Sequence, residues 1–251
     1  MTQKHKGIVR VGTSNVVVPG NKKSFPTEYH DKSRLNFYSS LLPSVEVNST
    51  FYKLPMPSTF ERWSMDVPNN FQFTIKLWRE ISHGKKLVYK WDDIDRFMQA
   101  ADRLGLKKGC ILIQFPGKIT FDYYNQVEDI LARLTEQDPH STWRKALEFR
   151  SSTWYVNETH ELLDEYGASI VLHDIPKSRN LLPNKTAKFI YLRYHGPTGN
   201  YRGSYSDEFL KDQSKKINAW LKTGKDVYAY FNNTMGSAFE NAMSLKKMLG
   251  G

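Results

Sequence analysis

The residues best suited to chemistry stand at alternate positions in short β-type runs. Glu46 and Asn48 alternate with valines in "SVEVNST". Glu148 lies in "KALEFR", and His195 comes near the end of "KFIYLRYHG". Two carboxylates and an imidazole can supply a general acid and a general base. We therefore take Glu46, Glu148 and His195 as candidate acid–base groups, and Asn48 as a candidate substrate ligand.

Three cations occupy comparable positions. Lys76 ends "FQFTIK", Arg150 ends "KALEFR", and Arg193 lies in "KFIYLRYHG". Arginine binds phosphate or carboxylate through two parallel hydrogen bonds, and lysine adds a point charge. Lys76 is also a candidate for a Schiff base, which requires a desolvated amine with a lowered pKa. The glycine-rich stretch "HGPTGNYRGSY" (195–205) follows the seventh run, where barrels often bind phosphate, although its glycines are equally suited to turns alone.

A divalent metal site is possible, but the pattern does not favour it, and no other cofactor is identified. "VLHDIP" places His173 beside Asp174, and His195 ends the following run. Barrels of the endonuclease or sugar-isomerase type use such ligands for zinc or manganese. Neighbouring strand residues point to opposite faces, however, and no H-x-H pair occurs at the strand ends. Cys110, the single cysteine, opens the apolar run "CILIQF" and is expected to be a buried structural thiol.

The elements that position these residues are eight β-type runs, at 8–14, 44–50, 71–76, 110–115, 145–150, 169–174, 188–196 and 226–233. Helical patterns lie between most of them, and three end at a glycine, Gly105, Gly167 or Gly224. This alternation predicts a parallel sheet, and eight units predict a TIM-type (β/α)8 barrel, with a doubly wound open sheet as the alternative. "IPKSRNLLPNKTA", between strands six and seven, holds two prolines and predicts an irregular loop or one short turn.

Side-chain parity indicates which residues face the barrel interior. Each run has one apolar parity, as in Val45 and Val47, which we expect to pack under the helices. The other parity is rich in polar and charged residues, where an ordinary barrel carries mostly branched aliphatics. Interior charges must be paired, hydrogen-bonded or in contact with a ligand. Either they form structural salt bridges, with Glu46 pairing with Arg10 or Lys76, or they belong to a site.

The strand ends favour a site. Each strand ends in a hydrogen-bonding side chain on or next to the interior face: Ser14, Asn48, Lys76, Gln114, Arg150, His173 or Asp174, His195 and Asn232. The C-terminal ends of barrel strands meet at the mouth where barrels bind their substrates. Nearby aromatic residues either wall this mouth or pack its loops: Phe51, Tyr52, Trp78, Trp154, Tyr201 and Tyr205.

The net charge of +10 suggests an anionic partner. The lysines are scattered in pairs such as Lys22–Lys23, which fits a cationic surface at least as well as a nucleic-acid face. No apolar run reaches 18 residues, and the N-terminus has no apolar signal region. We therefore expect a cytoplasmic protein with no membrane contact.

Taken together, these stretches resemble the YecE-like family, known as domain of unknown function 72. The similar stretches follow in order over nearly the whole chain: "VGTS", "VEVNSTFYKLP", "FQFTIKLWREISHGKKL", "LIQFP", "LEFRSSTW", "YLRYHG", "YSDEFL" and "YFNN…AFENAMSLKKML". The resemblance implies a TIM-type barrel and little about the reaction, because the family lacks an established activity. The sequence departs from the family pattern at Asn15–Val16, where Gly-Trp is usual, and at Gly117, where a second proline is usual.

The family-like positions complete the predicted site. We predict one domain, residues 1–251, that is an enzyme (a hydrolase, lyase or isomerase) acting by acid–base chemistry on a small anionic or polyhydroxylated substrate containing phosphate or sugar. The candidate catalytic residues are Glu46, Glu148, His195 and Lys76. The candidate substrate-binding residues are Asn48, Tyr52, His83, Gln114, Arg150, Trp154, Arg193, Tyr205 and Asn232. The alternative is a nucleic-acid-binding protein or a metal-dependent phosphodiester hydrolase.

Overall fold

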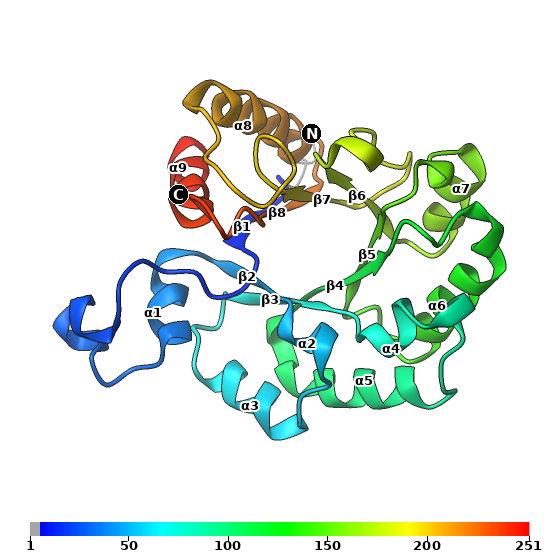
Figure 1. Cartoon of the computed structure of the whole chain (residues 1–251). Helices are drawn as coiled ribbons and strands as arrows, with labels where there is room; N and C mark the ends of the chain where they lie inside the picture. Colours follow the sequence, from blue (N-terminus) through cyan, green and yellow to red (C-terminus); the bar gives the residue numbers. More distant parts are fainter. Residues whose placement is uncertain (1–5, 251) are drawn as a thin grey trace, which may run out of the picture.

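Eight parallel strands form the centre of the computed structural model, which describes residues 6–250. They are β1 (Val9–Thr13), β2 (Ser44–Val47), β3 (Gln72–Lys76), β4 (Lys108–Phe115), β5 (Arg144–Phe149), β6 (Ser169–His173), β7 (Phe189–Tyr194) and β8 (Asp226–Phe231). Their order in the sheet follows the chain, with β8 beside β1. The strands surround a common axis with helices outside them (Figure 1), which confirms the predicted TIM-type barrel. Residues 1–5 and 251 of the predicted domain lie outside the described residues.

Helices lie between most of the strands, as predicted. They are α1 (Arg34–Leu41), α2 (Ser49–Tyr52), α3 (Pro57–Met65), α4 (Arg79–Ser82), α5 (Asp93–Ala101), α6 (Tyr124–Glu136), α7 (Asn157–Glu165), α8 (Asp207–Lys222) and α9 (Ala238–Met248). Of these, α2, α3 and α4 are helices for which no pattern was recognised in the sequence. Local chemistry sets their ends: the Ser206 hydroxyl accepts a hydrogen bond from the Phe209 N–H at the start of α8. Gly224, with a φ of +85°, follows its end.

The crossover from β6 to β7 lacks a helix, as the two prolines predicted. One 3-10 turn, Pro176–Ser178, lies in it, followed by a bridge between Asn180 and His173. No helix of residues 6–250 is long and apolar enough to cross a membrane.

The seam between β1 and β2 closes the barrel differently from the other strand pairs. One bridge, Ser14 to Glu46, joins the two strand ends. Below it, the Tyr38 hydroxyl accepts from the Thr13 N–H at 2.8 Å and donates to the Ser44 carbonyl at 2.9 Å. The Tyr38 side chain from α1 therefore links the two strands below the bridge, in place of direct backbone hydrogen bonds between them.

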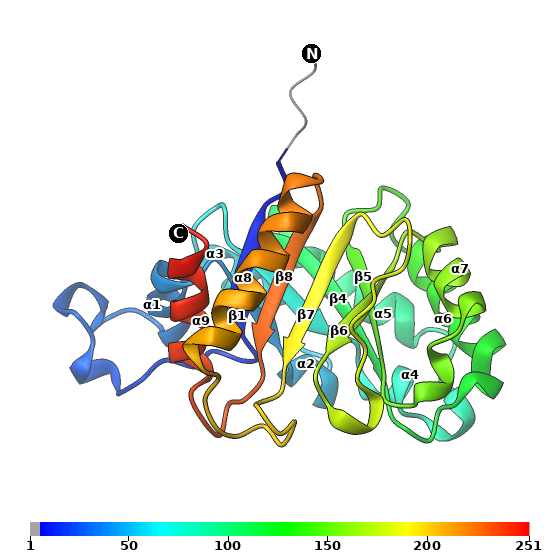
Figure 2. The same ribbon diagram turned by 90° about the horizontal axis from the view of Figure 1, so that it is seen from above.

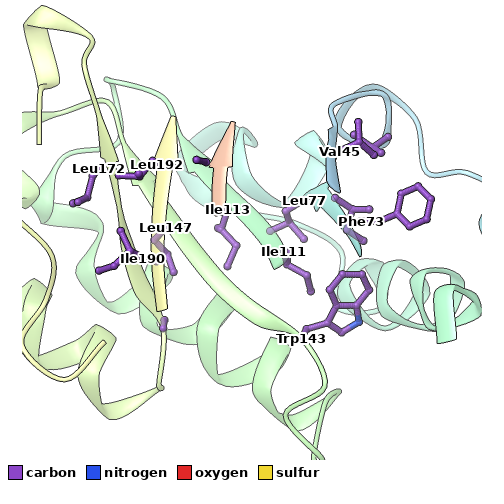
Figure 3. Close-up of a cluster of buried hydrophobic side chains, with 14 of the residues drawn as sticks. Val45, Phe73, Leu77, Ile111, Ile113, Trp143, Leu147, Leu172, Ile190 and Leu192 are labelled. Atoms are coloured by element: carbon purple, nitrogen blue, oxygen red, sulfur yellow. The ribbon is translucent and has the colours of Figure 1, made fainter. Parts of the chain in front are cut away.

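Strand parity separates two layers of side chains. The apolar layer under the helices is confirmed, whereas the interior layer, expected to be polar and charged, is in part apolar and aromatic. The outer layer packs under the helices and includes Ile111, Ile113 and Leu147 (Figure 3). The inner layer fills the lumen with Cys110, Leu112, Ala146, Val171, Phe189, Tyr191, Tyr228 and Tyr230. Cys110 is fully buried there, and burial raises the pKa of its thiol to about 12. The lumen is thus filled by packed side chains, and the tyrosines among them carry hydroxyl groups into this core.

Three lumen tyrosines bond other interior side chains through their hydroxyls. Tyr228 donates to Gln72 at 2.6 Å, and the Tyr230 hydroxyl lies 2.6 Å from the Ser44 hydroxyl. Tyr191 donates to Glu46 at 2.6 Å. All strands run in the same direction, and α2 and α4 lie at their C-terminal end (Figure 2). That end is the barrel mouth.

Candidate functional site

A chain of four charges closes the lumen below the mouth. Arg193 binds Glu46 through two hydrogen bonds, of 2.9 and 2.7 Å, and Glu148 through a third of 2.6 Å. The other Glu148 oxygen pairs with Arg150. Arg193, Glu46 and Glu148 are almost completely buried, while Arg150 is partly exposed at the mouth. Two negative and two positive charges therefore compensate one another.

The partner expected for Glu46 was wrong. Arg193, 147 residues further along the chain, occupies that place instead of Arg10 or Lys76. Glu46 also accepts hydrogen bonds from Ser14 and Tyr191, both of 2.6 Å. Burial acts to raise the pKa of Glu46, but Arg193 and these donors hold it below the ordinary value.

Glu148, like Glu46, is held in its charged form. Burial opposes its charge, but Arg150 and Arg193 hold the pKa of this carboxyl well below its usual range. A general acid at neutral pH needs a raised carboxyl pKa. The geometry therefore does not support the acid role predicted for Glu46 and Glu148. It favours a role for both carboxylates as fixed negative charges that orient two arginines.

His195 belongs to a second polar group, with Asp174 and Tyr205. Its Nδ1 lies 3.2 Å from Asp174 Oδ1, and its backbone N–H donates to the same oxygen. The Tyr205 hydroxyl donates to Asp174 Oδ2 and accepts from the Gly196 N–H. Arg150 Nη2 lies 3.4 Å from His195 Nε2, and since arginine cannot accept, Nε2 must be the acceptor. His195 is therefore a neutral imidazole with its proton on Nδ1; burial lowers its pKa.

Lys76 is a cation of the mouth without a carboxylate partner. Among residues 6–250, no carboxylate oxygen lies within 4.0 Å of its ammonium. Nζ instead donates to the neutral amide of Gln114 at 2.8 Å and lies 4.1 Å from the Phe51 ring centroid. Burial, reinforced by the charge of Arg193, lowers the pKa of Lys76 to about 8.

His83 stands beside this lysine as a neutral side chain. Its ring packs edge-on against Phe51, 4.7 Å between centroids, and its Nδ1 lies 3.0 Å from the Ser82 hydroxyl. Burial and the charge of Lys76 lower its pKa to about 4. Lys76 and His83, 7 positions apart in the chain, are thus brought together by the turn into α4.

Three amides complete the mouth. Gln114 lies on β4, Asn48 follows β2, and Asn232 follows β8, which are the positions that sequence parity predicted. Asn48 Nδ2 reaches Glu46 at 3.4 Å, while its buried Oδ1 accepts no hydrogen bond from any described residue. A buried acceptor without a partner is uncommon in folded proteins and marks Asn48 as a residue to explain.

Three predicted aromatic residues have different surroundings. Tyr52 is 69% exposed on the rim. Trp154 is completely buried outside the barrel, where it stacks on Phe149 at 4.4 Å and donates to the Ile119 carbonyl. Tyr205 is buried against Asp174. The structure therefore brings Tyr205 to the His195 group and does not bring Trp154 to the mouth.

Two residues of the site had weak signals in the sequence. Asp174 follows the last residue of β6, where the chain leaves the strand, so strand parity no longer indicated its direction. Tyr201 accepts from Arg150 at 3.3 Å and has a φ of +67°. The sequence indicated Tyr201 only as an aromatic residue that either walls the mouth or packs its loops.

The histidines and acids show no metal cluster among residues 6–250, where no group of three or more such side chains could hold an ion. His173 Nε2 faces the Tyr155 hydroxyl at 3.2 Å and the Phe149 carbonyl at 3.3 Å instead. Burial lowers the pKa of His173 to about 4, which keeps it neutral.

Comparison with known proteins assigns the chain to a family. Residues 10–251 match the family described as protein of unknown function DUF72. The chain belongs to this family. Among curated DUF72-like proteins it is 24% identical to UPF0759 protein YunF of Bacillus subtilis strain 168, over 90% of this chain and 89% of that protein.

Two solved DUF72 structures share the fold. A family member from Thermotoga maritima MSB8 is 27% identical, with a TM-score of 0.74 over 97% of this chain and 100% of that chain. A member from Enterococcus faecalis V583 is 23% identical, with a TM-score of 0.78 over 97% and 96% of the two chains.

Proposed function

We propose that this DUF72 protein is an enzyme that binds a small anionic or polyhydroxylated substrate at the barrel mouth and acts on it by acid–base chemistry. The observation that carries the proposal is the uncompensated charge of Lys76. The four-charge chain is neutral as a unit, and Asp174 accepts three hydrogen bonds of its own, from the His195 backbone, the His195 ring and the Tyr205 hydroxyl. The ammonium of Lys76 is partly buried and bonded only to an amide, so a bound anion would gain its most favourable interaction energy there.

The other mouth residues have distinct roles in this proposal. Arg150 is fixed on one side by Glu148, and its remaining contacts, to Tyr201 and His195, are long at 3.3 and 3.4 Å. A phosphate or carboxylate can replace these contacts with shorter, charge-assisted ones. The amides of Asn48, Gln114 and Asn232 are suited to sugar hydroxyls.

Proton transfer is assigned to Lys76 and His195. The pKa of Lys76, about 8, lies close to neutral pH, as an efficient general base requires. The Asp174 carboxylate fixes the tautomer of His195, leaving Nε2 as an acceptor beside Arg150. Glu46 and Glu148 hold the arginines in place.

Thermal unfolding with candidate anions tests the proposal. Inorganic phosphate, ribose 5-phosphate and glucose 6-phosphate are added at low salt to the wild type, to Lys76→Met and to Lys211→Met, which alters an exposed lysine of α8. An anion at 100 times its Kd stabilises the folded protein by about 2.7 kcal/mol. We expect at least one compound to raise the Tm of the wild type and Lys211→Met but not of Lys76→Met. Equal shifts in all three proteins, or none, would contradict it.

A groove beside the mouth supports nucleic-acid binding as a second candidate function. Tyr52, Lys53, Trp78, Arg96 and Arg103 line it, and the Arg96 guanidinium lies 5.7 Å from the Trp78 ring centroid. Exposed aromatic faces among cations suit stacked bases and a phosphate backbone. Binding of single-stranded oligonucleotides should then weaken steeply with salt. Affinity that is undetectable at low salt would exclude this candidate.

A further inference from the structure

Lys76 is held differently from the other basic groups that the mouth contains. It is the last residue of β3, so its backbone is fixed by the sheet, and its own carbonyl accepts a 2.7 Å hydrogen bond from Thr50. Lys76 is partly exposed, so part of this residue faces solvent. A strand-borne amine at a barrel mouth is a positioned group, unlike a lysine on a mobile loop.

The groups in direct contact with the amine are uncharged, and burial with the charge of Arg193 outweighs the more distant carboxylates of Glu148 and Glu46. Gln114 presents a carbonyl oxygen at 2.8 Å, and Phe51 covers one side at 4.1 Å. The neighbouring His83 is uncharged, while Arg193 and Arg150 disfavour a further positive charge. Burial together with cationic neighbours is the arrangement that activates lysines as nucleophiles.

From this arrangement we infer that Lys76 forms a Schiff base with its substrate, which makes the substrate a small aldehyde or ketone carrying a carboxylate or phosphate. The inference rests on the proposed function, since it names the substrate class of the same site. Arg150 would bind the anionic group. Gln114 accepts an N–H of Lys76 and thereby orients the nitrogen lone pair.

The chemistry requires no further reactant. The lone pair of the neutral amine forms a bond to the carbonyl carbon, and the π electrons move to oxygen. One proton passes from nitrogen to that oxygen, which gives a carbinolamine. The hydroxyl takes up one proton from the solvent and leaves as water while the nitrogen lone pair forms the C=N bond. The product is a protonated imine, and addition of water reverses each step.

The fraction of free amine gives the expected magnitude. A lysine with a pKa of about 8 is roughly half neutral at pH 8, whereas an ordinary lysine is about 0.3% neutral. Even with the lower basicity of its amine, Lys76 should react about tenfold or more faster than exposed lysines of the same chain.

Reductive trapping tests the inference on the wild-type protein. Glyoxylate or glycolaldehyde phosphate is added at pH 8 with sodium cyanoborohydride, and peptide mass spectrometry follows each lysine with time. Lys211, exposed on α8, is the internal reference. We expect adducts at Lys76 at about ten times the rate at Lys211 or more. Labelling of Lys76 no faster than Lys211 with both probes would overturn the inference.

A phosphate control separates the two proposals. If phosphate raises the wild-type Tm but Lys76 is not labelled preferentially, the Schiff base is refuted and the anion site stands. If Lys76 is labelled preferentially but no anion raises the Tm, the Schiff base stands and the anion site is refuted. Excess phosphate should also slow the labelling of Lys76 by glycolaldehyde phosphate and leave Lys211 unchanged.

Discussion

Replacing Lys76 by methionine should stabilise the protein at neutral pH while removing anion binding. Methionine keeps an unbranched side chain against Phe51 and places no charge in a partly buried position. The ammonium is disfavoured there, because its pKa falls from 10.5 to about 8 on folding. Functional groups that destabilise their own fold are typical of active sites.

The magnitude follows from the pKa and from the contacts that are lost. The lowered pKa corresponds to a cost of about 3 kcal/mol below pH 8. Methionine removes the hydrogen bond to Gln114 and the contact of the cation with Phe51, which together contribute about 1.5 kcal/mol. The variant should therefore be more stable than the wild type by roughly 1–2 kcal/mol at pH 7.

The difference must depend on pH with a defined sign. The folded lysine loses its proton near pH 8, whereas the unfolded one keeps it to about 10.5, so the wild type gains stability as pH rises through this window. The advantage of the variant should shrink by about 1.4 kcal/mol per pH unit above 8 and vanish near pH 9.

Urea unfolding followed by tryptophan fluorescence at pH 7, 8 and 9 measures these differences. Lys211→Met, on the surface of α8, should stay within about 0.5 kcal/mol of the wild type throughout. A Lys76→Met protein that is less stable at pH 7, or whose difference from wild type is constant with pH, would refute the reasoning.

Three further predictions concern the framework of the site. Arg193→Met leaves Glu46 and Glu148 without their buried partner and should destabilise the fold by about 3–5 kcal/mol in urea unfolding; a loss under 1 kcal/mol would contradict the charge chain. Tyr38→Phe removes the hydroxyl that links β1 to β2 and should cost about 1–3 kcal/mol and speed hydrogen exchange at the Thr13 amide, whereas unchanged exchange would argue against that link. The Cys110 thiol, buried and with its pKa raised to about 12, should resist iodoacetamide at pH 8 until the protein unfolds, and rapid labelling of the native protein would disprove its burial.

The sequence was sufficient for the barrel and for which residues point inward, because strand periodicity is a local property of the chain. Asn48, Gln114 and Asn232 reach the mouth for that reason. The partner of Glu46 was not predictable in the same way. Arg193 reaches it across the closed lumen, so the pairing depends on side-chain length and barrel geometry, which no local pattern encodes.

Predictions from strand periodicity failed for some residues that lie just beyond the strand ends. Trp154 ends the 3-10 turn Ser152–Trp154, which carries its ring into the outer core, although the sequence places it close to Arg150. The lowered pKa of Lys76 also required the structure, because it comes from burial and from cations on other strands.

The buried charge chain also constrains how the barrel is assembled. Glu46 comes from the second strand, and its counter-charge from the seventh, 147 residues later. A chain leaving the ribosome carries the carboxylates of Glu46 and Glu148 well before Arg193 is synthesised. A half-barrel ending after β4 would have to bury Glu46 uncompensated or leave its lumen wet. The two halves are therefore poor candidates for independent folding, and the mouth exists as a site only once the ring is complete.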